Sequence, residues 1–268
     1  MNRLEIMEQA ARAAGQFMLG ANSGVTTEKS NVKDFVTVAD IKSQDLIRTQ
    51  LREHFPEAVI LSEEDPEDER QALYQQDYSG FVLDPIDGTY NFKRDMRESA
   101  ISIGYVENGV PVAGVVYDPY RDELYKAEQG KGAFRNNEPI RASDQTDLRG
   151  ANVATSNGYD DEAAIRNLRR QIAIHEQTGV MPWTSISGSA VLALVWVACG
   201  RIDAIHHTGF KPWDNAAALL ICQEAGAITL ALQGEPAKFT DAALLVGTPK
   251  IVEQLNEIFH KLPKELLT

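Results

Sequence analysis

The chain has 268 residues, of which 43% are hydrophobic and 24% charged, a composition typical of a globular protein with one large or two small domains. Its net charge of −13 argues against a general nucleic-acid-binding face, and it would repel a phosphorylated substrate unless a local cation reversed the field. The N-terminus has no signal-peptide pattern, and the longest apolar run, Ala190–Cys199, is about half the roughly twenty residues that a membrane-spanning helix needs. We therefore expect neither a membrane nor a nucleic acid as partner.

The first half of the sequence predicts two helices followed by a run of strands. Apolar residues recur at helical spacing from Leu4 to Met18 and from Ile41 to Phe55, with Asp40 expected as N-cap of the second helix. An apolar strand over residues 59–62 ends in Glu63-Glu64, and the acidic stretch to residue 69 is expected to be a surface loop. Further strands are expected at residues 81–83, 101–106, 112–117 and 123–127, with turns at Asn108-Gly109, Asp118-Pro119 and Asn136-Asn137.

The second half alternates strands and helices without strict βαβ order, which predicts a mixed α and β fold. Strands are expected at residues 151–155, 202–205, 227–232 and 243–246, and helices at 160–175, from Ser189, from Asp214 and at the end of the chain. Unless His207 contacts a substrate, His206-His207 is expected to be an exposed strand end. The two cysteines, Cys199 and Cys222, lie among apolar neighbours and are predicted to be buried free thiols, which fits a cytoplasmic protein.

The most informative segment is Leu83-Asp84-Pro85-Ile86-Asp87-Gly88-Thr89, at the end of a predicted buried strand. Asp84 and Asp87 are held close together by Pro85, which fixes its own φ angle. Two crowded carboxylates repel each other unless a cation lies between them, and Mg²⁺ is the usual hard cation with oxygen ligands. Free backbone N–H groups at Gly88 and Thr89, where a helix could start, suit a phosphate. The pattern indicates metal-assisted phosphoryl chemistry, although an Asp-rich turn with Asp87 as a helix cap would give a similar sequence.

Two further carboxylate segments fit this interpretation. Glu63-Glu64 follows a predicted strand, and Asp214 opens an Ala-rich helix after Pro212-Trp213. Taken alone, the first pair could be a charged loop and Asp214 a helix N-cap.

These segments, together with Lys33–Asp40 and Glu224-Ala225-Gly226, resemble the inositol monophosphatase family of Mg²⁺-dependent, lithium-sensitive phosphatases. The motif Asp-Pro-Ile-Asp-Gly-Thr is highly specific, and the resemblance covers roughly residues 1–250. It implies an α+β fold, a layered α-β-α-β-α sandwich of the inositol monophosphatase and fructose-1,6-bisphosphatase type. It also implies a single domain over residues 1–268, with the metal site in about residues 1–150 and the substrate loops in about 151–268.

The resemblance also implies roles for individual residues. Two or three Mg²⁺ ions are expected on Glu63, Asp84, the Ile86 carbonyl, Asp87 and Asp214. Glu63, Thr89 and Asp40 are expected to position and deprotonate the attacking water. The substrate is expected to contact Asp87, Gly88, Thr89, Gly188, Ser189, Ala190, His207 and Asp214, and Lys29 matches a position that reaches toward the site. A homodimer is expected as well.

Two departures from the family pattern concern the substrate. His207 stands where inositol-preferring relatives carry a glutamate that grips a hydroxyl, and Ser185 stands where many members carry arginine. We therefore expect broader or shifted specificity, with discrimination by the loops 155–158, 185–190 and 206–210. Inositol phosphate, histidinol phosphate, a sugar bisphosphate and a 3′-phosphonucleotide all stay open as substrates. There are two rival functions: a metal- and phosphate-binding protein without turnover, and a nucleotide-handling transferase. The absence of a GxxxxGK[ST] loop counts against the transferase.

Overall fold

The computed structural model describes residues 1–21, 26–31, 34–156 and 160–267. In these ranges the helices are α1 (Arg3–Gly20), α2 (Val38–His54), α3 (Glu67–Arg70), α4 (Thr89–Lys93), α5 (Asp161–Thr178), α6 (Ala190–Ala198), α7 (Pro212–Glu224), α8 (Pro249–Phe259) and the short 3₁₀ turns η1 (Gln71–Tyr74) and η2 (Lys264–Leu266). The strands are β1 (Thr26–Asn31), β2 (Asp34–Thr37), β3 (Ile60–Ser62), β4 (Gly80–Asp87), β5 (Ala100–Glu107), β6 (Val110–Asp118), β7 (Glu123–Glu128), β8 (Ala133–Arg135), β9 (Glu138–Ile140), β10 (Asn152–Thr155), β11 (Trp183–Ile186), β12 (Ala204–Thr208), β13 (Ile228–Ala231) and β14 (Ala243–Gly247).

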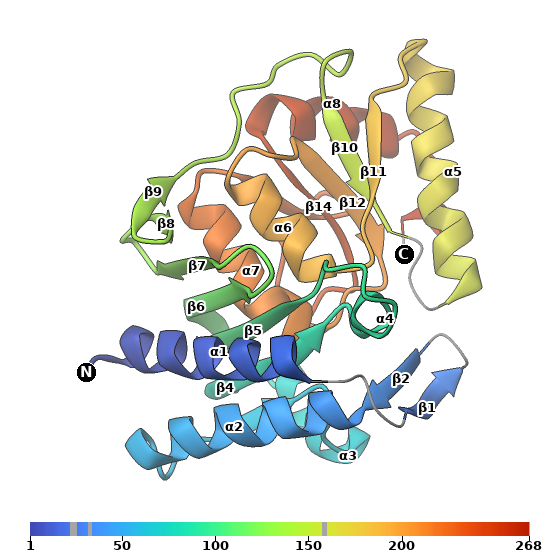
Figure 1. Cartoon of the computed structure of the whole chain (residues 1–268). Helices are drawn as coiled ribbons and strands as arrows, with labels where there is room; N and C mark the ends of the chain where they lie inside the picture. Colours follow the sequence, from blue (N-terminus) through green and yellow to red (C-terminus); the bar gives the residue numbers. More distant parts are fainter. Residues whose placement is uncertain (22–25, 32–33, 157–159, 268) are drawn as a thin grey trace.

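A seven-stranded sheet has the order β3-β4-β5-β6-β7-β8-β9, and in Figure 1 it runs from β4, beside α1 and α2, to β9 at the left of the molecule. β3 pairs parallel to β4, and every later neighbour is antiparallel. The predicted hairpins at Asn108-Gly109 and Asn136-Asn137 are confirmed, and all four residues have the positive φ angles that tight hairpins need. Helices α1 and α2 cover the outer face, where their apolar sides pack on β4, β5 and β6.

A five-stranded sheet, in the order β11-β10-β12-β14-β13, forms the second β layer. Helices α5 and α8 lie on its outer side, and α6 and α7 fill the space between the two sheets (Figure 1). The order of layers is therefore α-β-α-β-α, which confirms the predicted α+β sandwich.

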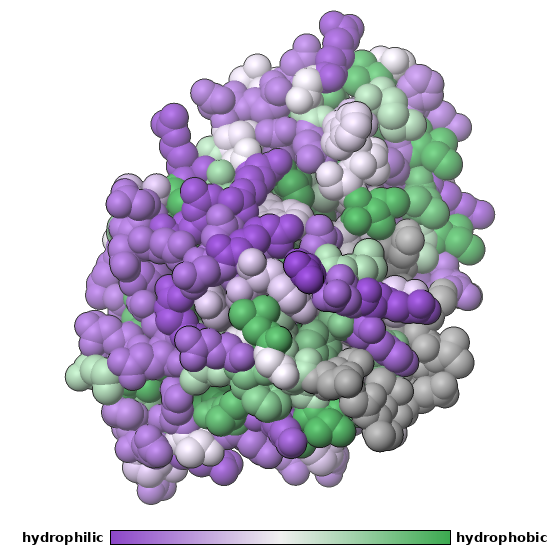
Figure 2. All heavy atoms as spheres, viewed as in Figure 1, coloured by the Kyte–Doolittle hydropathy of each residue, from purple (hydrophilic) through white to green (hydrophobic). Residues whose placement is uncertain are grey.

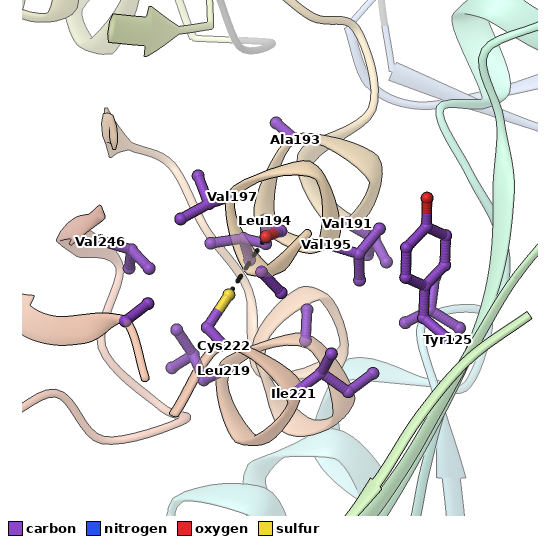
Figure 3. Close-up of a cluster of buried hydrophobic side chains, with 14 of the residues drawn as sticks. Tyr125, Val191, Ala193, Leu194, Val195, Val197, Leu219, Ile221, Cys222 and Val246 are labelled. Atoms are coloured by element: carbon purple, nitrogen blue, oxygen red, sulfur yellow. Dashed lines mark hydrogen bonds between the residues drawn. The ribbon is translucent and has the colours of Figure 1, made fainter. Parts of the chain in front are cut away.

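The core between the sheets is built around α6 and α7. Figure 3 shows Val191, Leu194, Leu219 and Ile221 from these two helices packed together, with the Cys222 thiol donating to the Leu194 carbonyl at 3.1 Å. The predicted buried helix at 190–199 is confirmed, and within the described ranges no helix is both long and apolar enough to cross a membrane. Both thiols are free, Cys222 buried and Cys199 half-buried.

Several elements differ from the sequence prediction. Helix α2 starts at Val38, because Thr37 is its N-cap and Asp40 is the third helical residue, whose carboxylate accepts the Thr37 N–H at 2.8 Å. The expected loop after Glu64 contains the short helix α3, and strands β1, β2 and β11 were not predicted.

The prediction for His206-His207 is wrong. β12 continues through both residues, which pair with Leu245 and Leu244 of β14, and both side chains are buried. The two histidines therefore lie inside the second sheet instead of at an exposed strand end.

Helix α5 presents an unusual distribution of side chains. Its apolar Ile165, Leu168 and Ile172 are exposed, whereas Arg170 and its polar neighbours Asn167 and Gln171 are buried against the second sheet. The face of the molecule drawn in Figure 2 is mostly hydrophilic, as the net charge suggests, but apolar side chains gather toward α5. The inner side of this helix therefore combines these three polar residues with the apolar Ala163, Ala173 and Ile174.

Candidate metal centre

A β-bulge brings the two aspartates of the Asp-Pro-Ile-Asp segment to the same side of β4. Asp84 pairs with Ser102 and Asp87 with Ala100, so three steps along β4 match two steps along β5. Without the bulge, two residues an odd number of positions apart would point to opposite faces of the sheet. The Ser43 hydroxyl donates to the Pro85 carbonyl at 3.0 Å and fixes the bulge from α2.

Asp214 comes to this pair from helix α7. Side-chain oxygens of Asp84, Asp87 and Asp214 all lie within 4.8 Å of one another, and the three side chains are buried. The helix can approach because small residues face each other, since a Cβ on Gly104 would lie 2.6 Å from that of Ala216. The Lys211 N–H donates to the Asp214 carboxylate at 2.8 Å, so Asp214 is held at the third helical position and is not the N-cap.

Asp87 is held by the beginning of α6. Its carboxylate accepts the Val191 N–H at 3.1 Å, the Ala190 N–H at 3.3 Å and a short hydrogen bond from the Ser189 hydroxyl. A helix N-terminus favours a negative charge, so α6 stabilises the ionised form of Asp87 in part.

Crowding and burial nevertheless disfavour ionisation of all three carboxyl groups. Burial is the largest cause that raises the pKa of Asp84 well above its usual range, and the charge of Glu63 raises it further. Burial raises the pKa of Asp87 to about 7 against the opposing hydrogen bond from Ser189. The pKa of Asp214 is raised well above normal by burial and then by the charge of Asp87.

This donor set fits Mg²⁺. The available atoms are hard carboxylate oxygens on rigid elements, and their raised pKa values mean that protons must otherwise neutralise the cluster. A divalent cation would replace those protons and relieve the repulsion. Asp84, Asp87 and Asp214 would hold such an ion.

Glu63 and Glu64 reach the same cavity from the end of β3, because parallel strands β3 and β4 end at the same edge of the sheet. Arg70 of α3 donates to the Glu63 carbonyl at 3.0 Å and fixes the turn. The next acid, Asp65, forms an ion pair with Arg48 of α2 and accepts the Ser62 N–H at 2.8 Å. Asp65, which also lines the cavity, therefore anchors the loop that carries Glu63 and Glu64.

Thr89 begins the short helix α4 beside Asp40. Its hydroxyl lies 3.3 Å from the Asp40 carboxylate and 3.1 Å from the Ile86 carbonyl, so it can donate to either acceptor. Gly88 precedes it with a φ of 80°, and a Cβ there would lie 2.9 Å from the Glu98 carbonyl oxygen. Only glycine fits this turn without strain.

A cavity of about 1140 Å³ opens over the carboxylates. Predicted site residues that line it are Glu63, Asp84, Asp87, Gly88, Thr89, Gly188, Ala190, His207 and Asp214. Ser189 contacts Asp87, and Ser185 hydrogen-bonds Asn152 at 2.9 Å and lines a separate, smaller cavity. Of the predicted loop 155–158, Ser156 lines the main cavity, whereas residues 157 and 158 and the Lys29 side chain lie outside the described residues.

Sequence reasoning missed several residues that shape the site. Asn91 lies so close to the Gly188 backbone that a Cβ on Gly188 would meet Asn91 Oδ1 at 2.5 Å. Asn167 of α5 lies 2.8 Å from the ring of His207. Asn91 follows the Asp-Pro-Ile-Asp-Gly-Thr motif by two residues and could have been flagged, but nothing local links Asn167 to a strand 40 residues away.

The sequence profile described as the inositol monophosphatase family matches residues 2–264. The chain belongs to this family. Its members are metal-dependent phosphatases, and the acidic cluster lies where such a protein could bind its metal.

Relatives within the inositol monophosphatase family carry different names. An inositol-1-monophosphatase from Synechocystis is 34% identical over 97% of this chain and 90% of its own length. A fructose-1,6-bisphosphatase/inositol-1-monophosphatase from Thermotoga maritima is 30% identical over 99% of both. The crystal structure of the extragenic suppressor protein suhB from Bartonella henselae superposes with a TM-score of 0.85 at 29% identity, covering 96% of this chain and 98% of that one. The family is therefore established, and the substrate is not fixed by these names.

Proposed function

We propose that this protein is a Mg²⁺-dependent phosphomonoesterase that hydrolyses small phosphorylated alcohols, with inositol 1-phosphate as one of several substrates. The observation that carries the proposal is the convergence of three buried carboxylates, Asp84, Asp87 and Asp214, beside the Gly88-Thr89 turn in one cavity. Two or three Mg²⁺ ions, when bound to these residues, Glu63 and the Ile86 carbonyl, would lower the pKa of a water molecule and stabilise charge on the phosphate and on the leaving oxygen.

Groups of the protein would bind the phosphate, activate the water and contact the alcohol part of the substrate. The backbone N–H groups at Gly88 and Thr89 would bind phosphate oxygens. Thr89 and Asp40 would orient the attacking water and take up its proton, because Thr89 lines the cavity and its hydroxyl lies 3.3 Å from the buried Asp40 carboxylate. Glu63, which lines the same cavity, would take part in this step with them. The alcohol part would then lie against Gly188, Ala190 and His207.

A bisphosphatase activity is the second candidate, and two observations favour it. One relative named above carries both activities in its name, and the cavity of about 1140 Å³ has room for more than a cyclitol monophosphate. Histidinol phosphate and 3′-phosphoadenosine 5′-phosphate stay open as further substrates.

Phosphate release from a panel of these four esters tests the proposal. Activity should require Mg²⁺, disappear in EDTA and return when Mg²⁺ is restored. Asp214→Asn should abolish it, whereas Asp118→Asn is a matched control, because Asp118 is equally buried but pairs with Arg121 outside the cavity. Turnover without divalent metal, or normal turnover by Asp214→Asn, would refute the assignment.

The proposal extends to three properties that the family resemblance implies. Li⁺ should inhibit at the site of Asp84, Asp87 and Asp214, with Na⁺ as the ionic-strength control. The protein should be a homodimer, which sedimentation would show, and should act in the cytoplasm.

A further inference from the structure

The side chain of Asn167 has only one orientation that satisfies its neighbours. Its Oδ1 accepts the Thr208 N–H at 2.8 Å and a short hydrogen bond from the Arg170 guanidinium. Both of these partners are donors, so the opposite orientation would set the amide NH₂ against two N–H groups. The Nδ2 group therefore points the other way, toward the Ser156 carbonyl at 2.7 Å and the His207 Nδ1 at 2.8 Å.

This orientation determines the tautomer of His207. Because Asn167 Nδ2 can only donate, His207 Nδ1 must accept, and the ring proton must lie on Nε2. His206 is held in the same way, since its Nδ1 accepts from Arg170 Nε at 3.4 Å and its Nε2 faces Gln171 Oε1 at 2.8 Å. Two adjacent histidines are thus fixed as neutral rings by polar residues of α5.

Arg170 strengthens the arrangement. Its side chain is fully buried, and its described partners are the uncharged groups of His206, Asn167, Thr208 and Leu266. Burial is the largest cause that lowers the pKa of His207 to about 3, the positive charge of Arg170 is the next, and a hydrogen bond that the protonated ring would donate to the Ser156 backbone opposes them. The hydrogen-bond chain Arg170–Asn167–His207 also polarises each link in the same direction, which makes the final N–H a better donor.

The Nε2 side of the His207 ring is next to the cavity. His207 and Gly209 both line it, and a Cβ on Gly209 would lie 3.1 Å from His207 Nε2. His207 is 4% exposed, and because position 209 has no side chain, no Cβ covers the Nε2 edge of the ring at this point.

We propose that Asn167, which is held by Arg170, is a positioning residue that fixes His207 as a hydrogen-bond donor. The preferred substrates then carry an acceptor oxygen opposite His207 Nε2, and this oxygen need not bear a proton. This class includes keto, carboxylate and phosphate groups as well as hydroxyls. This inference about specificity rests on the proposed phosphatase function. A glutamate at position 207 would instead require a hydroxyl that donates, since a carboxylate facing a carbonyl leaves two acceptors unpaired.

The tautomer can be tested without activity. In metal-free protein labelled with ¹⁵N at histidine, the two-bond ¹⁵N–¹H spectrum should show His207 with bare Nδ1 and protonated Nε2 at pH 8, assigned by loss of the signals in His207→Gln. Asn167→Asp should move the proton to Nδ1, because the new carboxylate can only accept. Gln171→Glu, which places a carboxylate beside His206 instead, should leave His207 unchanged. A protonated Nδ1 in the wild-type spectrum would overturn the proposal.

Specificity is tested with dihydroxyacetone phosphate and glycerol 3-phosphate, which differ only in a C2 carbonyl or hydroxyl. Wild type should hydrolyse both with kcat/KM values within about threefold, and Gln171→Glu should keep that ratio. Asn167→Asp and His207→Glu should each lower the ketone-to-alcohol ratio about tenfold or more at pH 8. Ratios unchanged in both variants would refute the specificity role, whereas failure to release phosphate from any ester would refute the phosphatase function and leave the spectroscopic result standing.

Discussion

The backbone N–H of Val191 donates to the carboxylate of Asp87 at 3.1 Å, across 104 residues of sequence. This contact joins the bulged end of β4 to the first turn of α6, so the same helix start both supports a proposed metal ligand and forms the wall beside Gly188 and Ala190. A shift of α6 would therefore alter metal affinity and substrate position together.

Replacing a single member of the carboxylate cluster should separate activity from stability. Asp84→Asn should lower kcat by about two orders of magnitude or more, because it removes charge that the metal needs. In EDTA the same variant should raise Tm by a few degrees, since it removes a buried carboxyl whose ionisation is disfavoured. Activity assays with saturating Mg²⁺ and calorimetry in EDTA check the two effects, and a lower Tm in EDTA would contradict the account of the cluster.

Metal-free protein should become less stable as pH rises from about 4 to about 7. Folded Asp87 has a pKa of about 7, above the unfolded value near 3.9, so the folded state binds more protons across this interval and the free energy of unfolding falls with pH. Urea unfolding in EDTA at several pH values measures the slope. Asp87→Asn should reduce it, and added Mg²⁺ should remove it, because the ion takes the place of the protons.

The two buried histidines, His206 and His207, should make the protein less stable as the pH falls, which is opposite to the effect of Asp87. Burial lowers the pKa of His206 well below normal and that of His207 to about 3, so the unfolded chain binds more protons once the pH drops below about 6.5. Stability is therefore lost as pH falls from that point. The variant His206→Gln should be less stable than wild type at pH 7. Between pH 7 and pH 5 its free energy of unfolding, measured with urea, should fall by less than that of wild type. A pH response identical to that of wild type would mean that His206 does not contribute.

The Gly88 turn should tolerate no side chain. Gly88→Ala should destabilise the protein by about 1–3 kcal/mol and reduce activity sharply, because a Cβ would meet the Glu98 carbonyl in a backbone conformation that alanine avoids. Gly179→Ala is the matched control, since Gly179 has a φ of 68° at the end of α5 with open space around it. It should cost about 1 kcal/mol and spare activity. Equal effects of the two changes on kcat would argue against a special role for Gly88.

The sequence by itself determined the local features of this protein. The apolar run before Asp84 predicted a buried strand, although β4 continues through a bulge as far as Asp87 instead of ending in a turn. The hairpins at Asn108-Gly109 and Asn136-Asn137 followed from residues that accept positive φ angles. These are short-range effects of sterics and backbone preference, so one short segment of sequence is enough to read them.

Only the tertiary structure decided how distant segments meet. The approach of Asp214 to Asp84 depends on small residues at the contact of α7 with β5. Asp84 and Asp87 reach the same face of β4 only through a bulge, which the sequence pattern does not predict. Helix α5 buries Asn167, Arg170 and Gln171 together with Ala173 and Ile174, because the three polar side chains find partners in β12 and β11, and it leaves Ile165 and Ile172 exposed. Hydrophobic spacing predicts that a segment is helical, but the side it buries is set by hydrogen-bond partners on strands far away in the sequence.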